Sequence, residues 1–148
     1  MYESYSKQAL PSKEYRELLG TALCVFNSNN NFVIENILKN DKENKYNWYE
    51  LLDKTSGQLR EPIKMTITKI SNSIIAKQFN RLIEYRNRIL HSFQITCNEK
   101  LSILDRDKQV LATKNKNGVQ EVITEDYLMN FIKLNGCFSS ELHKYRGY

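Results

Sequence analysis

Apolar residues recur three and four positions apart over most of the chain, which is the period of an α-helix that buries one face. Residues 13–26 and 73–94 show this period most clearly. Ser12 precedes the first of these segments, where its hydroxyl can cap a helix. The asparagine-rich run 27–31 predicts a break, because Asn and Ser side chains compete for nearby backbone hydrogen bonds. A second helix is then expected over residues 32–38.

The remaining segments continue the helical pattern with one interruption. A short helix is expected over residues 48–52, and the ambiguous stretch 59–70 favours a helix. Between residues 101 and 123 the pattern changes to β-branched and apolar residues around the turn signal 115–118. The sequence therefore predicts a β-hairpin of about 101–123, followed by a last helix that Thr124 caps.

Composition places the chain among ordinary globular domains. With 148 residues, of which 41% are hydrophobic and 26% charged, a single mainly α-helical domain over residues 1–148 is expected. No apolar run approaches the roughly 20 residues that cross a bilayer, and the first residues lack the features of a secretory signal. A cytoplasmic location without membrane contact is therefore expected. Cys24, Cys97 and Cys137 have neither disulfide nor metal spacing and are expected to be reduced and buried.

Several chemistries can be excluded from the sequence motifs. The five glycines are too scattered for a phosphate-binding loop, and neither HExxH nor GxSxG occurs. Because His, Asp and Glu form no dense cluster, any catalysis is expected to proceed without a metal or another cofactor. Lys and Arg number 22 against 17 for Asp and Glu, and the resulting net charge of +5 favours anionic partners.

One residue disturbs the helical wheel of residues 73–94. The polar and apolar residues of this segment separate onto opposite faces, yet Arg86 falls within the apolar face. A buried guanidinium needs an ion pair, an interface or a functional cleft, because an isolated buried charge is strongly destabilising. An arginine that only anchors a neighbouring helix is an equally good interpretation at this point.

The polar face of the same helix carries a histidine beside a row of cations. His91 follows the basic stripe, a name used here for Lys77, Arg81 and Arg88. Such a stripe is either a solvated face or a track for phosphate groups. A lone histidine on a polar face is commonly just solvated, so only its combination with Arg86 singles out His91.

The segment 86–91 resembles the signature of the HEPN family, which is an arginine, usually followed by a polar residue, and then a histidine after four to six intervening residues. Here four residues separate Arg86 from His91, and Asn87 occupies the polar position. HEPN domains carry this motif toward the end of a long helix in a small helical bundle. The resemblance therefore implies a HEPN-like antiparallel helical bundle, with the small β-hairpin as an insertion before the last helix.

HEPN domains commonly act as metal-independent endoribonucleases whose active site forms where two motif helices meet in a homodimer. The resemblance implies that Arg86 and His91 are catalytic, that Asn87 supports them, and that RNA is the substrate. It also implies a toxin or phage-defence effector, controlled by an antitoxin or another regulatory partner. One HEPN subgroup carries a tyrosine two residues after the histidine, which its partner modifies. Phe93 stands there in this chain and has no hydroxyl to modify.

The residues of the motif can perform this chemistry. Cleavage by the neighbouring 2′-hydroxyl requires a base, an acid and positive charge on the transition state. His91 suits either proton role, Arg86 suits the oxyanion, and the basic stripe would bind RNA phosphates. His143 is expected at the surface near the C-terminus, so the second proton carrier would come from a second copy of the chain.

Two points stay open at the level of sequence. On a regular helix Arg86 and His91 point about 140° apart, so the arginine stem could curl, a π-bulge could realign the pair, or a twofold partner could complete the site. The alternative function is a non-catalytic HEPN-like module that binds RNA or a protein. A DNA-binding helix-turn-helix is disfavoured, because no short helix pair with a glycine turn occurs.

Overall fold

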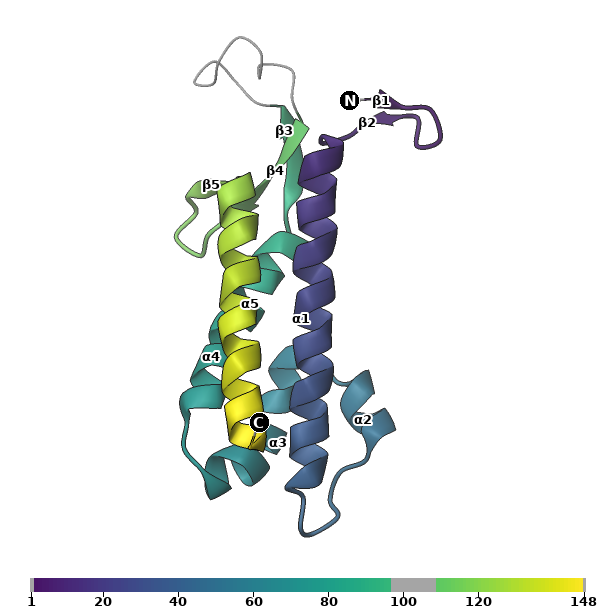
Figure 1. Cartoon of the computed structure of the whole chain (residues 1–148). Helices are drawn as coiled ribbons and strands as arrows, with labels where there is room; N and C mark the ends of the chain where they lie inside the picture. Colours follow the sequence, from purple (N-terminus) through teal and green to yellow (C-terminus); the bar gives the residue numbers. More distant parts are fainter. Residues whose placement is uncertain (1, 97–108, 148) are drawn as a thin grey trace.

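The computed structural model describes residues 2–96 and 109–147, so Cys97 and residues 101–104 of the expected hairpin lie outside the described residues. Within these ranges three long helices dominate the fold (Figure 1), and they are α1 (Lys13–Lys39), α4 (Ile74–Leu90) and α5 (Glu125–Arg146). Shorter helical segments join α1 to α4: α2 (Trp48–Asp53), the 3-10 turn η1 (Ser56–Leu59), α3 (Arg60–Ile63) and the π-helical turn η2 (Lys64–Thr68). The expectation of a mainly helical chain is confirmed, including the helical interpretation of residues 59–70.

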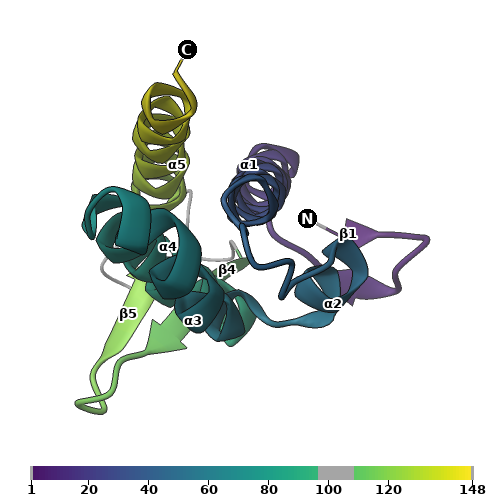
Figure 2. The same ribbon diagram turned by 90° about the horizontal axis from the view of Figure 1, so that it is seen from below.

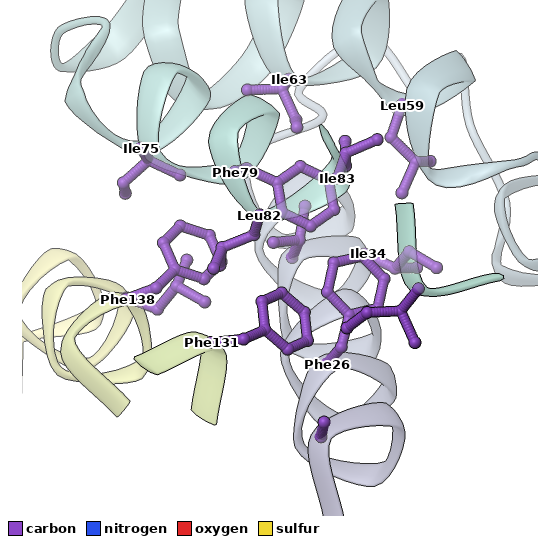
Figure 3. Close-up of a cluster of buried hydrophobic side chains, with 14 of the residues drawn as sticks. Phe26, Ile34, Leu59, Ile63, Ile75, Phe79, Leu82, Ile83, Phe131 and Phe138 are labelled. Carbon is purple, nitrogen blue, oxygen red and sulfur yellow. The ribbon is translucent and has the colours of Figure 1, made fainter. Parts of the chain in front are cut away.

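Aromatic rings lie between α1, α4 and α5 (Figure 3), and Figure 2 shows the arrangement of these three helices from below. Phe26 of α1 stacks on Phe79 of α4 and on Phe131 of α5, with ring centroids 6.0 and 6.2 Å apart. Phe79 also stacks on Phe138 at 5.6 Å, and Tyr85 stacks on Phe131 at 5.9 Å. The four phenylalanines are at most 1% exposed. Each ring pair contributes about 0.5–1.5 kcal/mol beyond the burial of its area, so these contacts hold the three helices together.

The order of the interhelical contacts shows how the helices run. The two aromatic contacts between α4 and α5 occur in opposite order along the two helices, so α4 is antiparallel to α5. Asn29 and Asn36 of α1 bond in the same order to Asn135 and Arg146 of α5, so α1 is parallel to α5. The prediction of an antiparallel bundle is therefore wrong for this pair. The three long helices alternate in direction along the chain, so the first, α1, and the third, α5, run parallel.

The predicted break at residues 27–31 is also wrong, because α1 continues without interruption to Lys39. Asn29 is buried, and its Nδ2 donates to the backbone oxygen and to Oδ1 of Asn135 at 2.9 and 3.0 Å. Asn30 Oδ1 accepts a hydrogen bond from Ser56 Oγ at 2.7 Å. These amides bond to other elements instead of to their own backbone, which removes the competition that would have ended the helix.

A three-stranded antiparallel sheet covers one end of the bundle, in the order β3 (Phe93–Thr96), β4 (Gln109–Lys114) and β5 (Gln120–Ile123). A second, two-stranded sheet pairs β1 (Tyr2–Glu3) with β2 (Gln8–Ala9). The predicted turn at 115–118 joins β4 to β5. The expected helix of residues 73–94 ends earlier, at Leu90, and Phe93 pairs with Ala112 in the sheet. Ser92 closes the last helical turn, since its hydroxyl donates to the Ile89 carbonyl at 2.6 Å.

Two expectations based on composition can be compared with the described residues. Cys24 and Cys137 are exposed, which corrects the expectation of buried thiols. They lie on the solvent side of α1 and α5, whose opposite faces supply the aromatic core. Within residues 2–96 and 109–147, no helix combines the length and the apolar content that crossing a bilayer requires.

Tyr15 fastens the sheet to α1. This residue is 3% exposed, and its hydroxyl donates to the Ile123 carbonyl at 2.6 Å and accepts from the Leu111 N–H at 3.2 Å. One side chain of α1 therefore satisfies backbone groups of both β4 and β5. The sheet is consequently placed at the beginning of α1 and of α5, beside the end of α4.

Replacing Tyr15 by Phe should lower the free energy of unfolding by about 1–3 kcal/mol, because two buried backbone groups lose their partner. Urea denaturation followed by circular dichroism would show a lower midpoint and an unchanged slope. Tyr49→Phe is the matched control, because Tyr49 is 79% exposed. The control should stay within about 0.5 kcal/mol of the parent protein. Equal midpoints for the two variants would contradict the role assigned to Tyr15.

Candidate functional site

Arg86 lies against the aromatic core, and no acidic side chain in the described part of the chain pairs with it. Its Cζ is 4.8 Å from the ring centroid of Phe26, and its Nε–H donates to Asn87 Oδ1 at 3.1 Å. The ion pairs of residues 2–96 and 109–147 do not include this guanidinium. The interpretation of Arg86 as an ion-paired anchor therefore has no support in the described part of the chain. The arginine instead rests on Phe26 by a cation–π contact.

Partial burial gives this guanidinium an unusual electrostatic environment. Desolvation lowers the pKa of Arg86 from its ordinary value. The group still carries its charge at neutral pH, because the ordinary pKa of arginine exceeds about 12. A charge that has lost part of its water and has no counter-ion interacts strongly with an incoming anion. Arg86 is therefore suited to hold a phosphate oxygen.

His91 is the residue at which α4 ends. Its backbone N–H donates to the Asn87 carbonyl at 2.9 Å, and its side chain is exposed. The helix is regular from Ile74 to Leu90, so a π-bulge does not realign Arg86 with His91. The π-helical turn lies instead at η2, before α4 begins.

The two motif residues nevertheless line one groove, which we name the motif groove. One wall is the end of α4 and consists of Arg86, Asn87, Leu90 and His91. The opposite wall comes from Asn27 and Asn30 of α1 and from residues 54–57. The motif groove has a volume of about 520 Å³, which is within the range of sites that hold small molecules. The groove is thus large enough for a nucleotide beside Arg86 and His91.

A second hollow adjoins the motif groove, and we name it the cationic depression. Asn87 and His91 line both hollows, so the two meet at the end of α4. The cations of the depression come from three different elements and are Arg60, Arg88, Lys114 and Lys116. Glu84 is the acidic residue in its described lining. Three of these cations, Arg60, Lys114 and Lys116, were not predicted from the sequence. The sequence signal that could have indicated them was the pair of lysines around the hairpin turn.

The basic stripe predicted from the sequence does not stay together in space. Arg88 lies in the cationic depression, with its Cζ 6.0 Å from the ring centroid of Tyr85. Lys77 and Arg81 precede His91 by about 21 and 15 Å along the axis, at 1.5 Å per residue. Arg81 lines a small hollow on the α5 side of the helix, next to Leu134 and Cys137, and Lys77 is exposed.

The second histidine of the chain lies away from both hollows. His143 is exposed in the last turns of α5, where its Nδ1 is 2.7 Å from the Ser139 carbonyl oxygen. Its ring centroid is 4.9 Å from that of Phe32, on a different side of α1. One chain therefore brings a single histidine to the motif groove. Among the described residues, no three His, Cys, Asp or Glu side chains come together in a group that could hold a metal ion.

Comparisons with protein-family models, with curated proteins and with solved structures find no match to this chain. What can be said of its chemistry therefore comes from the geometry of the motif groove and the cationic depression, together with the motif of residues 86–91.

Replacing Arg86 by Met should change the free energy of unfolding by less than about 1 kcal/mol. The loss of a cation–π contact of about 0.5–2 kcal/mol is offset by the removal of a partly desolvated charge. Urea midpoints of the Arg86→Met variant and of the exposed-site control Arg81→Met would measure the difference. A loss above about 2 kcal/mol at position 86 alone would show that this arginine is a structural anchor.

Proposed function

We propose that this protein is a metal-independent endoribonuclease of the HEPN type. The observation that carries the proposal is a half-buried arginine that has no counter-ion among residues 2–96 and 109–147 and shares one groove with a histidine. A fully solvated arginine would need no explanation, and an ion-paired structural one would have a carboxylate partner. Arg86 has neither environment, whereas a substrate phosphate in the motif groove would supply the missing negative charge.

The proposed reaction uses the RNA's own 2′-hydroxyl as nucleophile. The 2′-oxygen bonds to phosphorus while the bond from phosphorus to the 5′-oxygen breaks, which leaves a 2′,3′-cyclic phosphate and a 5′-hydroxyl. A base takes the proton of the 2′-hydroxyl, and an acid gives a proton to the departing 5′-oxygen. His91 performs one of these transfers, and Arg86 stabilises the charge on the two non-bridging oxygens. Asn87 positions Arg86 through the hydrogen bond to Nε.

A second copy of the chain supplies the other proton carrier. Because one protomer brings one histidine to the groove, a twofold homodimer would bring a second His91 to the same place. Two apolar residues next to His91 support a contact at this surface. Leu90 is 54% exposed, and Phe93, which the wheel assigned to the apolar face, is 39% exposed. Covering them in a dimer would remove apolar surface from water.

The resemblance in residues 86–91 also supports the proposed biological role, a cytoplasmic toxin or phage-defence effector that an antitoxin or another regulatory protein restrains. The net charge of +5 agrees with an RNA substrate. Regulation by modification of a tyrosine after the motif is not part of the proposal, because Phe93 stands at that position.

The purified protein should cleave single-stranded RNA in the presence of EDTA and leave 2′,3′-cyclic phosphate ends. Arg86→Ala and His91→Ala should each lower the single-turnover rate by about 10²- to 10⁴-fold, because each removes a group that acts in the transition state. His143→Ala is the matched control and should cleave at the parent rate. Full activity of His91→Ala would exclude the mechanism, and RNA binding without any cleavage would favour a non-catalytic module.

The Phe93→Arg variant should be monomeric and should cleave at least about tenfold more slowly than the parent protein. A charge at an apolar contact is unfavourable, while Phe93 lines neither the motif groove nor the cationic depression, so the loss would reflect the missing partner. Ile74→Arg, at the exposed beginning of α4, is the control and should remain dimeric. Sedimentation velocity and cleavage measured on the same samples test both statements. A fully active monomer would contradict the composite site.

A further inference from the structure

Four of the positive charges around His91 lie in the cationic depression. Arg60 comes from α3, Arg88 from α4, and Lys114 and Lys116 from β4 and the turn that follows. None of the four forms an ion pair within residues 2–96 and 109–147, and the carboxylate in the described lining is that of Glu84. Four cations therefore face one carboxylate in the described lining, and this excess of positive charge favours an anionic ligand.

The turn that carries the two lysines has a defined backbone. Asn115 donates its N–H to the Val119 carbonyl at 2.9 Å, and Gly118 donates to the Asn115 carbonyl at 2.9 Å. Gly118 has a φ of +84°, which glycine adopts without strain. Lys114 and Lys116 are consequently held at the rim of the cationic depression by the backbone of a closed turn.

Two of the side chains in the floor of the depression are also held in place. Arg60 donates its Nε–H to Asn80 Oδ1 at 3.0 Å, which ties α3 to α4 beside the depression. The guanidinium of Arg88 lies over the ring of Tyr85. Cations that are already positioned lose little conformational freedom when a ligand binds, so these two should contribute efficiently to affinity.

The shared lining of the two hollows indicates which anion fits. A ligand in the cationic depression reaches Asn87 and His91, which also line the motif groove beside Arg86. The opposite wall of the groove has a single cation, Lys54, beside the neutral side chains of Asn27 and Asn30. A chain with several phosphates fits this arrangement better than a single small anion does. Single-stranded RNA combines a flexible backbone with bases that can leave the stack.

We propose that the cationic depression, with Lys114 and Lys116 at its rim, binds the backbone phosphates of single-stranded RNA on one side of the bond that is cut in the motif groove. The choice of RNA rests on the proposed function. The assignment replaces Lys77 and Arg81 of the basic stripe with Lys114, Lys116 and Arg60 as the residues that hold the substrate, and it keeps Arg88.

Fluorescence anisotropy with a short labelled single-stranded RNA tests this site, and the His91→Ala background prevents cleavage during the titration. Adding Lys114→Ala and Lys116→Ala together should weaken binding roughly tenfold and reduce the slope of log affinity against log salt by about 1.4, which corresponds to two lost phosphate contacts on a single strand. The charge-matched control combines Lys13→Ala with Lys133→Ala, two exposed lysines of α1 and α5. The control should leave the affinity within about twofold of the background.

The variant that combines Lys114→Ala with Lys116→Ala is called the turn variant. Unchanged RNA affinity in the turn variant, or an equal loss of affinity in the control, would overturn the phosphate site. Weaker binding in Lys77→Ala with Arg81→Ala, but not in the turn variant, would place the RNA along the exposed face of α4 and overturn it as well. Cleavage by the corresponding variants with His91 intact separates the two proposals. Protein that binds RNA through the turn but never cuts it contradicts only the proposed function, and protein that cuts RNA equally well without the turn lysines contradicts only the phosphate site.

Discussion

The contact of Phe26 with its neighbours fixes both the core and the candidate site. The buried ring stacks on Phe79 of α4 and Phe131 of α5, and the guanidinium of Arg86 lies 4.8 Å from its centroid. One side chain of α1 therefore sets the positions of the other two long helices and also supports the arginine. A change in the packing of α1 against α4 would displace Arg86 relative to the motif groove. The stability of the bundle and the geometry of the groove are coupled through this ring.

Arg86 occupies a position on the wheel that packing alone would give to an apolar residue. Burial lowers the pKa of its guanidinium, and within the described residues its one hydrogen bond goes to Asn87. The cation–π contact with Phe26 compensates for part of the lost hydration. A leucine or methionine at this position would need no such compensation. Departures from the packing pattern that have no structural benefit concentrate at functional sites, because there the chemistry requires them.

The features of the fold that could be predicted are those that short-range chemistry decides. Ser12 and Thr124 cap their helices as expected, each by accepting from the N–H of the residue three positions later. The continuity of α1 could not be predicted, because the partner of Asn29 is Asn135, 106 residues further along the chain. A local preference for a break of a few tenths of a kcal/mol per residue is outweighed by buried hydrogen bonds of about 1 kcal/mol each. The end of α4 could not be predicted for the same reason, because Phe93 pairs with Ala112, a residue distant in the sequence, in the sheet.

The candidate site likewise contains residues that local sequence could predict and residues that only the tertiary structure brings in. Arg86 and His91 lie five residues apart, so the wheel for Arg86 and the motif of residues 86–91 for His91 were sufficient to single them out. Arg60 and Lys114, by contrast, reach the same place only through the docking of α3 and of the sheet on α4. One face of a single helix presents its charges in a row along the helix axis. The far end of such a row is too distant from His91 to act on the same phosphate. A groove collects charges from several elements around one point. The net charge of +5 has no location in the sequence, whereas in the folded chain four cations meet a single carboxylate next to His91 at the end of α4.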